Sequence, residues 1–441
     1  MSLIGRETHM RLKTRTTVAA LAVLAAAAPA TVVIAPASAG PGTSDRSSAH
    51  KPKDPNATPF ALRAWGYSTR ATGGDVPTDS GGTAWEVIGC TNRAGLHHTN
   101  NIAGVTLPGL GTISAAKTRV WTTRKGGVVS SWARNTIGKV VLSDSPLGTL
   151  TLNAVSSTAR AYHDGSKFKT STNTDLARLT FAGPVGPAQD FPIPAPGRPV
   201  TIPGFAKVTV AASNTPTTKN GARAYSNGLK VELFATHSTV RVAHAVAQIL
   251  SGVQTGLFSG QSAAVTGNAA SGVVGLGRNT LLKMPCQGTD GVVKTRSASS
   301  TDLGGQVAVG VAKSEEMAKQ NGKKAWGYTR SRVASFSLGD QLRIEGIVGQ
   351  VNVSRTGSHL RKLNRSTKGT TIGTIVVNGE PRKFPDTGVL EIPGVAKLQR
   401  SVTEKSKNGL SVIALRIKLL DGTGAVIDLG NARMQVRRSA H

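Results

Sequence analysis

Cysteine is the residue type in this chain whose chemistry is easiest to predict. There are two, Cys90 and Cys286, and they lie 196 positions apart. That distance excludes the closely spaced pair of a CxxC metal or redox motif. A disulfide between them would close a long loop and, in the chain-entropy model, stabilise the fold by about 5 kcal/mol. Two separate buried thiols are the alternative.

Histidines, serines and carboxylates show no pattern typical of a catalytic or metal site. His97 and His98 are adjacent, so on a strand their side chains point to opposite faces and cannot easily bind one metal. The chain has no HExxH and no GxSxG sequence, and the glycine-rich segment 272–277 lacks the GxGxxG order. The sequence therefore predicts no catalytic, metal-binding or cofactor-binding residue and no cofactor. A hydrolase whose residues meet only on folding stays an alternative.

The tetrapeptide Ala-Trp-Gly-Tyr occurs twice and supplies the candidate binding aromatics. The first copy contains Trp65 and Tyr67, and the second contains Trp326 and Tyr328. Such side chains form a surface on which sugar rings stack, or they anchor strands in a core. Both interpretations stay open, and the four residues are the candidates for surface binding.

The formal net charge of +30 is the strongest compositional feature. Residues 1–39 contribute +3, which leaves +27 on the rest of the chain. Outside a cell this charge favours polyanions such as anionic wall polymers or polysaccharide. The Lys and Arg residues form no dense run and no nucleic-acid motif, so solubility is the alternative explanation.

Residues 1–39 have the pattern of a signal peptide, with Met10 as an alternative start. A basic stretch precedes an apolar run, which ends in the small-residue sequence Ala37-Ser38-Ala39. Residues 40–58 are rich in Gly, Pro and Ser, which predicts a disordered linker. No later segment has the roughly 18 apolar residues that a membrane span needs. We therefore expect a secreted protein without a transmembrane span in its mature form.

An internal repeat organises the rest of the chain. Ile202-Pro203-Gly204 recurs as Ile392-Pro393-Gly394, and further matches in the same order place one cysteine in each copy. We expect one repeat over 60–250 and a second over 260–438. Because export leads to an oxidising compartment and the cysteines occupy equivalent places, the sequence favours the Cys90–Cys286 disulfide.

Apolar and polar residues alternate within each repeat. Leu229, Val231 and Leu233 alternate with charged residues, and segment 415–419 repeats the pattern. A period of two predicts strands with one buried face, and Asn-Gly and Asp-Gly turns separate them. The expected fold is all-β: two homologous antiparallel β-sandwich or jelly-roll-like domains from an internal duplication, with at most short helices. Segment 311–323 is the one candidate helix.

These strands resemble the choice-of-anchor P family of secreted actinobacterial proteins. The similar stretches include 154–161, 179–183 and 228–233 in the first repeat, and 375–379 and 413–417 in the second. The resemblance implies an exported or cell-surface β-rich protein of unassigned function, and supplies no active-site residue. The end of the chain, 433–441, has no Leu-Pro-x-Thr-Gly signal or apolar helix, so we expect release or a loose association with the wall.

Together these features predict a secreted, non-enzymatic protein with a structural or adhesive role at the cell wall. A polyanion- or polysaccharide-binding module is the first alternative, and the hydrolase is the second.

Overall fold

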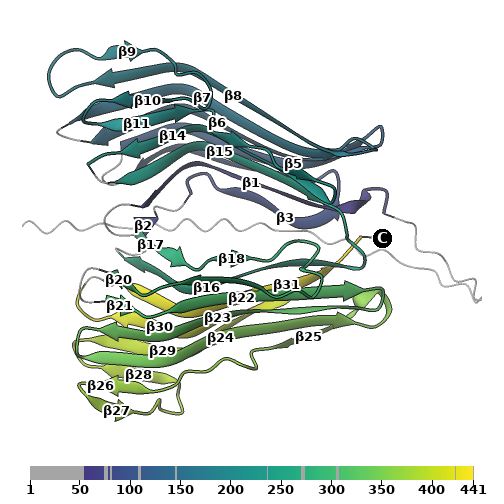
Figure 1. Ribbon diagram of the computed structural model, residues 1–441, viewed down its shortest axis with the longest axis vertical. Coiled ribbons are helices and arrows are strands. Elements are labelled where there is room, and N and C mark those ends of the chain that lie inside the picture. The colour runs from purple at the N-terminus through teal and green to yellow at the C-terminus, as the bar shows by residue number, and fades with distance from the viewer. Residues whose placement is uncertain are drawn as a thin grey trace, which may run out of the picture. The chain divides into compact units, whose positions relative to one another are not determined.

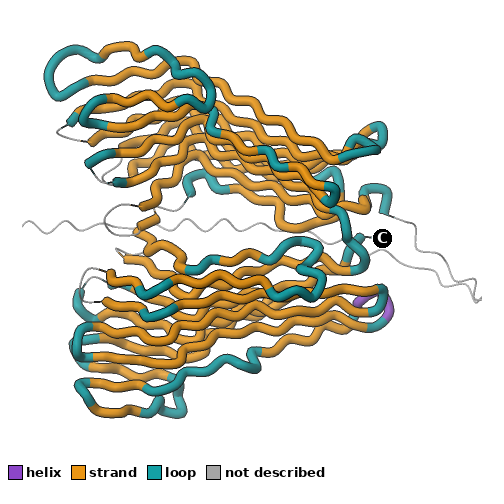
Figure 2. The backbone as a smooth tube through the Cα atoms, viewed as in Figure 1, coloured by secondary structure: helices purple, strands orange, loops and turns teal. Residues whose placement is uncertain are grey.

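The computed structural model describes residues 54–73, 78–79, 82–107, 111–144, 147–235, 237–269, 274–303, 307–422 and 424–440. The predicted signal peptide and most of the predicted linker lie outside these ranges. Nearly all described elements are strands, with one short 3₁₀ helix, η2 (Ser358–Leu360) (Figure 2). The all-β prediction is therefore confirmed. None of the described helices has the length and apolar character needed to span a membrane.

The largest sheet, sheet A, has sixteen antiparallel strands within the described ranges. They are β1 (Ala57–Gly73), β2 (Thr78–Asp79), β3 (Glu86–Arg93), β10 (Pro199–Ile202), β11 (Ala206–Val210), β12 (Ser213–Asn214), β13 (Thr217–Thr218), β14 (Gly221–Leu233), β15 (Ser238–Leu250), β16 (Gly256–Ala269), β17 (Val274–Asn279), β18 (Leu282–Lys283), β28 (Val389–Ile392), β29 (Ala396–Ser406), β30 (Gly409–Leu419) and β31 (Val426–Arg438).

The order of these strands is the same from both ends of sheet A (Figure 1). One half is β10-β11-β14-β15-β1 and the other is β28-β29-β30-β31-β16, and the β2–β17 pairing joins the two halves. A duplication would produce this order, but the common origin of the two halves stays a prediction.

Two further sheets complete the fold. Sheet B is a six-stranded meander of β4 (His97–Leu107), β5 (Gly111–Lys125), β6 (Val128–Asp144), β7 (Gly148–His163), β8 (Phe168–Ala182) and β9 (Gln189–Phe191). Sheet C contains β19 (Lys294–Ala298), β20 (Thr301–Leu303), β21 (Val307–Val309), β22 (Ala312–Asn321), β23 (Lys324–Leu338), β24 (Leu342–Thr356), β25 (Lys362–Ser366), β26 (Ile375–Val377) and β27 (Glu380–Arg382).

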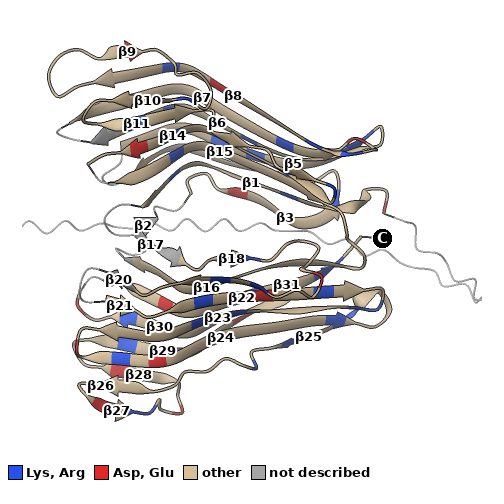
Figure 3. Ribbon diagram, in the orientation of Figure 1, with Lys and Arg blue, Asp and Glu red and all other residues tan. Residues whose placement is uncertain are grey.

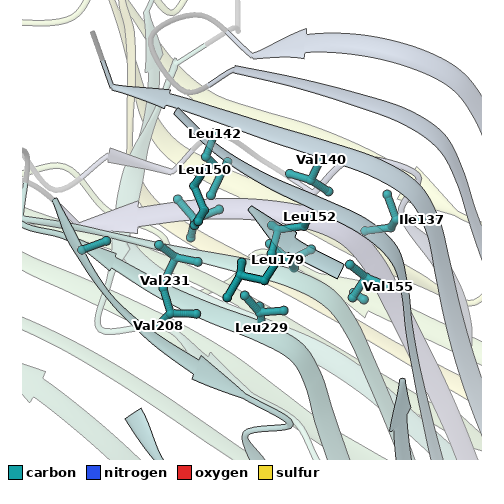
Figure 4. Close-up of a cluster of buried hydrophobic side chains, with 14 of the residues drawn as sticks. Ile137, Val140, Leu142, Leu150, Leu152, Val155, Leu179, Val208, Leu229 and Val231 are labelled. Atoms are coloured by element: carbon teal, nitrogen blue, oxygen red, sulfur yellow. The ribbon is translucent and has the colours of Figure 1, made fainter. Parts of the chain in front are cut away.

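Each half of sheet A packs on one of these sheets and encloses an apolar core. In the first sandwich, Leu229 and Val231 of β14 pack with Leu150 and Leu152 of β7 (Figure 4). The intervening residues point outward, as a period of two requires. The second sandwich repeats this arrangement, with Leu415 and Ile417 of β30 buried in the same cluster as Leu342 and Ile344 of β24.

The repeated Ile-Pro-Gly sequences form the same turn in both sandwiches. Each has Pro in the second and Gly in the third turn position, with φ values of 71° at Gly204 and 70° at Gly394. The amide of the fourth residue donates to the carbonyl of Ile202 or Ile392. These are the requirements of a type II turn, which explains why this sequence occurs at both places.

The predicted helix over Val311–Lys323 is wrong. Ala312–Asn321 forms β22, which pairs with β19 and β23. Ala312 and Ala318 face the core, while Lys313 and Lys319 point to the other face. Only four apolar side chains are spread over this segment, so its weak helical pattern gives way to pairing with two neighbouring strands.

The sandwiches meet at the disulfide. Cys90 and Cys286 are bonded, with Cα atoms 5.4 Å apart, so that prediction is confirmed. Both cysteines are buried in a small cluster with Ala61 of the first sandwich and Leu257 of the second. The other four clusters of buried residues in the described ranges each belong to one sandwich.

Candidate functional site

A depression of about 290 Å³ lies on the face of sheet C that points away from sheet A, and it is open to solvent. Trp326 and Tyr328 of β23 and Met317 of β22 form one part of its lining. Ser354 of β24 and Asn364 of β25 form another part. The second Ala-Trp-Gly-Tyr copy therefore lies on a surface beside amide and hydroxyl groups.

The alternation of β23 brings these aromatic side chains together. Ala325 and Thr329 are buried toward the core, so Trp326 and Tyr328 between them point outward. Across the sheet, Trp326 is opposite Ser354, which is opposite Asn364 on β25. The polar groups thus lie in the same row as the indole, within the reach of a ligand that covers it.

Cations flank both rings. The Lys324 Nζ lies 4.8 Å from the centroid of the Trp326 ring, and the Arg330 Cζ lies 5.3 Å from that of Tyr328. Arg330 is also paired with Glu315, with an N···O distance of 2.6 Å. Burial alone would raise the pKa of Glu315, but a hydrogen bond from Lys313 and the charge of Arg330 lower it overall. The Glu315 carboxylate is therefore ionised and paired.

Sheet B carries an aromatic row at the corresponding place. In sheet B, Trp132 of β6 is opposite Arg160 of β7, which comes ten residues after the buried Leu150. In sheet C, Tyr328 of β23 is opposite Asn352 of β24, which comes ten residues after the buried Leu342. Trp132 thus occupies in sheet B the register position that Tyr328 occupies in sheet C. Both β7 and β24 also contain a residue with positive φ four positions after that leucine.

The rings of sheet B stack on each other, unlike those of the depression. Trp121 and Trp132 have centroids 5.4 Å apart and an interplanar angle of 9°. Arg160, from the strand on the other side, lies 4.6 Å from the Trp132 centroid and donates hydrogen bonds to Ser130. Both faces of Trp132 are therefore occupied, which leaves sheet C with the better site for a ring-shaped ligand.

The first Ala-Trp-Gly-Tyr copy does not form a surface. Trp65 is 9% exposed and Tyr67 is 4% exposed. Tyr67 stacks on His244 and on Trp85, with centroid distances of 4.5 Å and 5.7 Å. Of the two interpretations, the structure supports the strand anchor for these two residues, because both side chains are buried and β1 is paired on both edges, with β15 and with β3.

The histidines predicted to have no metal role lie apart from the depression. His97 and His98 are both exposed on β4, and the Nδ1 of His98 lies 3.0 Å from the Val87 carbonyl oxygen. Within the described ranges, no group of three His, Cys, Asp or Glu residues could hold a metal ion.

Two titratable groups that the sequence does not single out are shielded from solvent: His244 is half-buried and Glu316 is buried. His244 hydrogen-bonds to Asn227 at 2.6 Å, and burial, followed by the charges of Arg241 and Arg223, lowers its pKa to about 3. Glu316 is 1% exposed, and burial raises its pKa to about 7. Neither residue lines the depression on sheet C. The residues next to His244 and Glu316 in the sequence do not predict this burial, because it depends on the strands that pack over the two side chains.

Comparisons with known proteins identify no family. No family model matches the chain, and no curated protein is significantly similar to it. The resemblance to the choice-of-anchor P family therefore stays a prediction.

Proposed function

We propose that this chain is a secreted, non-enzymatic protein that binds polysaccharide at the cell surface in an adhesive or structural role. The depression at Trp326 and Tyr328 is the proposed sugar site. The observation that carries this proposal is the placement of two half-buried aromatic rings beside free polar groups on an open sheet face. Sugar rings have apolar faces that pack on aromatic rings and hydroxyls that need hydrogen-bond partners.

The polar groups of the depression support this proposal. Asn352 is held by Gln350, which donates to its Oδ1 at 2.8 Å, and by its own bond to the Lys368 carbonyl at 2.9 Å. Among the residues that the structure describes, the side chains of Ser354 and Asn364 have no hydrogen-bond partner. A fixed amide beside two available groups suits a ligand with several hydroxyls.

A binding experiment with matched variants tests the sugar site. The full chain is screened against immobilised neutral and acidic oligosaccharides, and the strongest ligand is then titrated by calorimetry. Trp326→Ala should weaken binding about tenfold or more, because the loss of an aromatic contact of about 1.4 kcal/mol has that effect. Trp85→Ala is the control, since Trp85 is 39% exposed and lies outside the depression. Equal affinities of the two variants would exclude this site.

Secretion and the absence of catalysis need separate measurements. Expression in an actinobacterial host should give a culture-medium protein whose first residue is Gly40, as the Ala37-Ser38-Ala39 sequence predicts. Retention of residues 1–39 in the cell envelope would contradict the cleavage. Turnover of a bound polysaccharide that one point mutation abolishes would favour the hydrolase alternative.

The charge of the chain favours an acidic polymer as a second candidate ligand. Arg119 of β5 and Arg134 of β6 are exposed and directly opposite each other, although like charges at such positions repel. Lys and Arg also occur on strands of both sandwiches (Figure 3). The double variant Arg119→Gln/Arg134→Gln should elute from heparin at a lower salt concentration than the unchanged chain. This shift in salt concentration should be larger than that of the control variant Arg361→Gln/Arg382→Gln. Equal shifts would argue against this surface.

A further inference from the structure

A row of three long polar side chains crosses the face of sheet A that points away from sheet B. Arg63 of β1 is opposite Gln248 of β15, which is opposite Arg223 of β14. Leu62 and Ala64 are buried against sheet B, so Arg63 between them points to the other face. Because neighbouring strands are about 4.8 Å apart, the two guanidinium groups can approach one another over Gln248.

The ring of Trp65 lies beneath these cations. The Arg63 Cζ is 4.7 Å and the Arg223 Cζ is 5.7 Å from its centroid. The Nζ of Lys283, which comes from β18 of the second sandwich, lies 6.0 Å from the same centroid. Three cations from three strands therefore surround one indole. Arg223 is exposed, so this place is open to solvent on the β14 side.

Arg63 and Arg223 have no counter-ion in the part of the chain that the structure describes. No carboxylate lies within 4.0 Å of either guanidinium, and neither group donates a hydrogen bond there. Burial and then the charge of Arg223 lower the pKa of Arg63. A half-buried cation beside a second cation is costly unless an anion or several acceptors compensate it.

Two other arginines, one buried and one half-buried, show how this fold satisfies such groups. Arg355 is 7% exposed and donates to the carbonyls of Val436 and Leu360 and to Asn408. Arg416 makes a two-point pair with Asp428, at 2.7 and 2.9 Å. Arg63 and Arg223 lack both kinds of partner, which distinguishes their row from structural arginines.

We propose that Arg63 and Arg223, with the Gln248 amide between them and Trp65 beneath, form a binding site for a tetrahedral oxyanion, phosphate or sulfate. Two guanidinium groups present planar sets of N–H donors that match oxyanions, and the amide adds a neutral donor. The anion is either a free ion or a group on a polymer, since the same donors recognise both. This site is separate from the proposed sugar site on sheet C and does not depend on it.

Calorimetry and thermal unfolding of the full chain with sodium phosphate and sodium sulfate test the site. Sodium chloride at equal ionic strength is the reference, because it reproduces screening without the tetrahedral ligand. The unchanged chain should bind phosphate or sulfate and unfold at a higher temperature than in chloride. Arg223→Gln and Arg63→Gln should each weaken this binding at least tenfold. Arg361→Gln, the control, removes the same charge from an exposed position of the second sandwich and should leave the affinity for phosphate and sulfate unchanged.

Two results would overturn the proposal. One is equal behaviour of the unchanged chain in phosphate, sulfate and chloride. The other is equal anion affinity in Arg223→Gln and Arg361→Gln, which would show that the cations only cover Trp65. Arg223 is exposed, so its variant tests the site even if Arg63→Gln does not fold.

Polymer competition distinguishes the two sources of the anion. Heparin and polyphosphate that compete with phosphate, and that bind Arg223→Gln more weakly than Arg361→Gln, would indicate a polymer-borne group. Binding of inorganic phosphate without such competition would indicate the free ion, and either outcome supports the site. Trp326→Ala should keep the phosphate effect, so failure of the sugar proposal would not be mistaken for failure of this one.

Discussion

Removal of the disulfide should both destabilise the chain and uncouple its two sandwiches. The perturbation is the double replacement Cys90→Ala/Cys286→Ala. Alanine is preferred to serine because both positions are buried in an apolar cluster. A serine hydroxyl without a hydrogen-bond partner there would destabilise the fold in its own right. The double variant also avoids a single unpaired thiol, which could form intermolecular bonds.

The size of the effect follows from the loop that the bond closes. The cysteines are separated by 196 residues. For a loop of that length the chain-entropy model gives about 5 kcal/mol at 25 °C, and native disulfides typically contribute about 2 to 5 kcal/mol when removed. Since folded domains are stable by only about 5 to 15 kcal/mol, this is a large share of the total.

Uncoupling follows from the separate cores. Within the described ranges, the one cluster of buried residues shared by the two sandwiches is the one that contains the disulfide. Other links include the short β2–β17 pairing, two hydrogen bonds between Asn92 and Ala440 at 3.0 and 2.8 Å, and the Lys283 ammonium 6.0 Å from the Trp65 centroid. Without the covalent bond, we expect each sandwich to unfold as its own cooperative unit.

Differential scanning calorimetry and guanidinium unfolding measure both effects. The unchanged chain should give one transition, and the double variant should give two, with the less stable one shifted to lower temperature and denaturant. Four of the five tryptophans lie in the first sandwich, so fluorescence in a Trp326→Phe background follows that sandwich alone. The unchanged chain in reductant is the control and should match the variant. A loss of stability below about 1 kcal/mol would refute the loop-closure reasoning.

Two further predictions concern buried groups. The raised pKa of Glu316, about 7 against an ordinary 4.5, means that the folded state holds a proton that the unfolded state releases. Its stabilising contribution is therefore present below pH 4.5 and is lost as the pH rises toward 7, which lowers the free energy of unfolding by about 3 kcal/mol in all. Urea unfolding from pH 4.5 to 7.5 should show this loss in the unchanged chain but not in Glu316→Gln. A Cβ at Gly349 would lie 1.8 Å from the Gly430 carbonyl oxygen, so Gly349→Ala should cost about 3 kcal/mol in thermal unfolding. At Gly346 the nearest atom would be 3.7 Å from the added Cβ, so no clash arises and only the positive φ of 65° opposes alanine. Gly346→Ala should therefore lower the free energy of unfolding by only about 1 kcal/mol. Similar losses for the two variants would contradict the contact argument.

Local patterns were sufficient to predict the strands of the sandwiches. The alternation in Leu229–Leu233 has the buried and outward faces that a period of two predicts, since each such strand has one face on a core. In segment 312–321 the polar residues Ser314 and Glu316 occupy inward positions. Polar residues in a core hide the alternation of a strand, so the local pattern of this segment favours a helix.

The candidate sites depended on information that no short segment contains. Trp65 and Trp326 lie in identical tetrapeptides, yet one is covered in sheet A and the other lines an open depression. The difference comes from what packs on each strand, not from the neighbouring residues. The Arg63–Gln248–Arg223 row likewise joins three strands from distant parts of the chain, so only the strand register could reveal it.

The type II turns at Ile202-Pro203-Gly204 and Ile392-Pro393-Gly394 also limit self-association. Each follows the outermost strand of sheet A, β10 at one end and β28 at the other, and both strands have only four residues. An exposed strand edge can template the addition of a strand from another molecule, and short edge strands followed directly by proline offer few amide donors for it. The most conspicuous repeated sequence of the chain thus limits strand addition at both margins of sheet A.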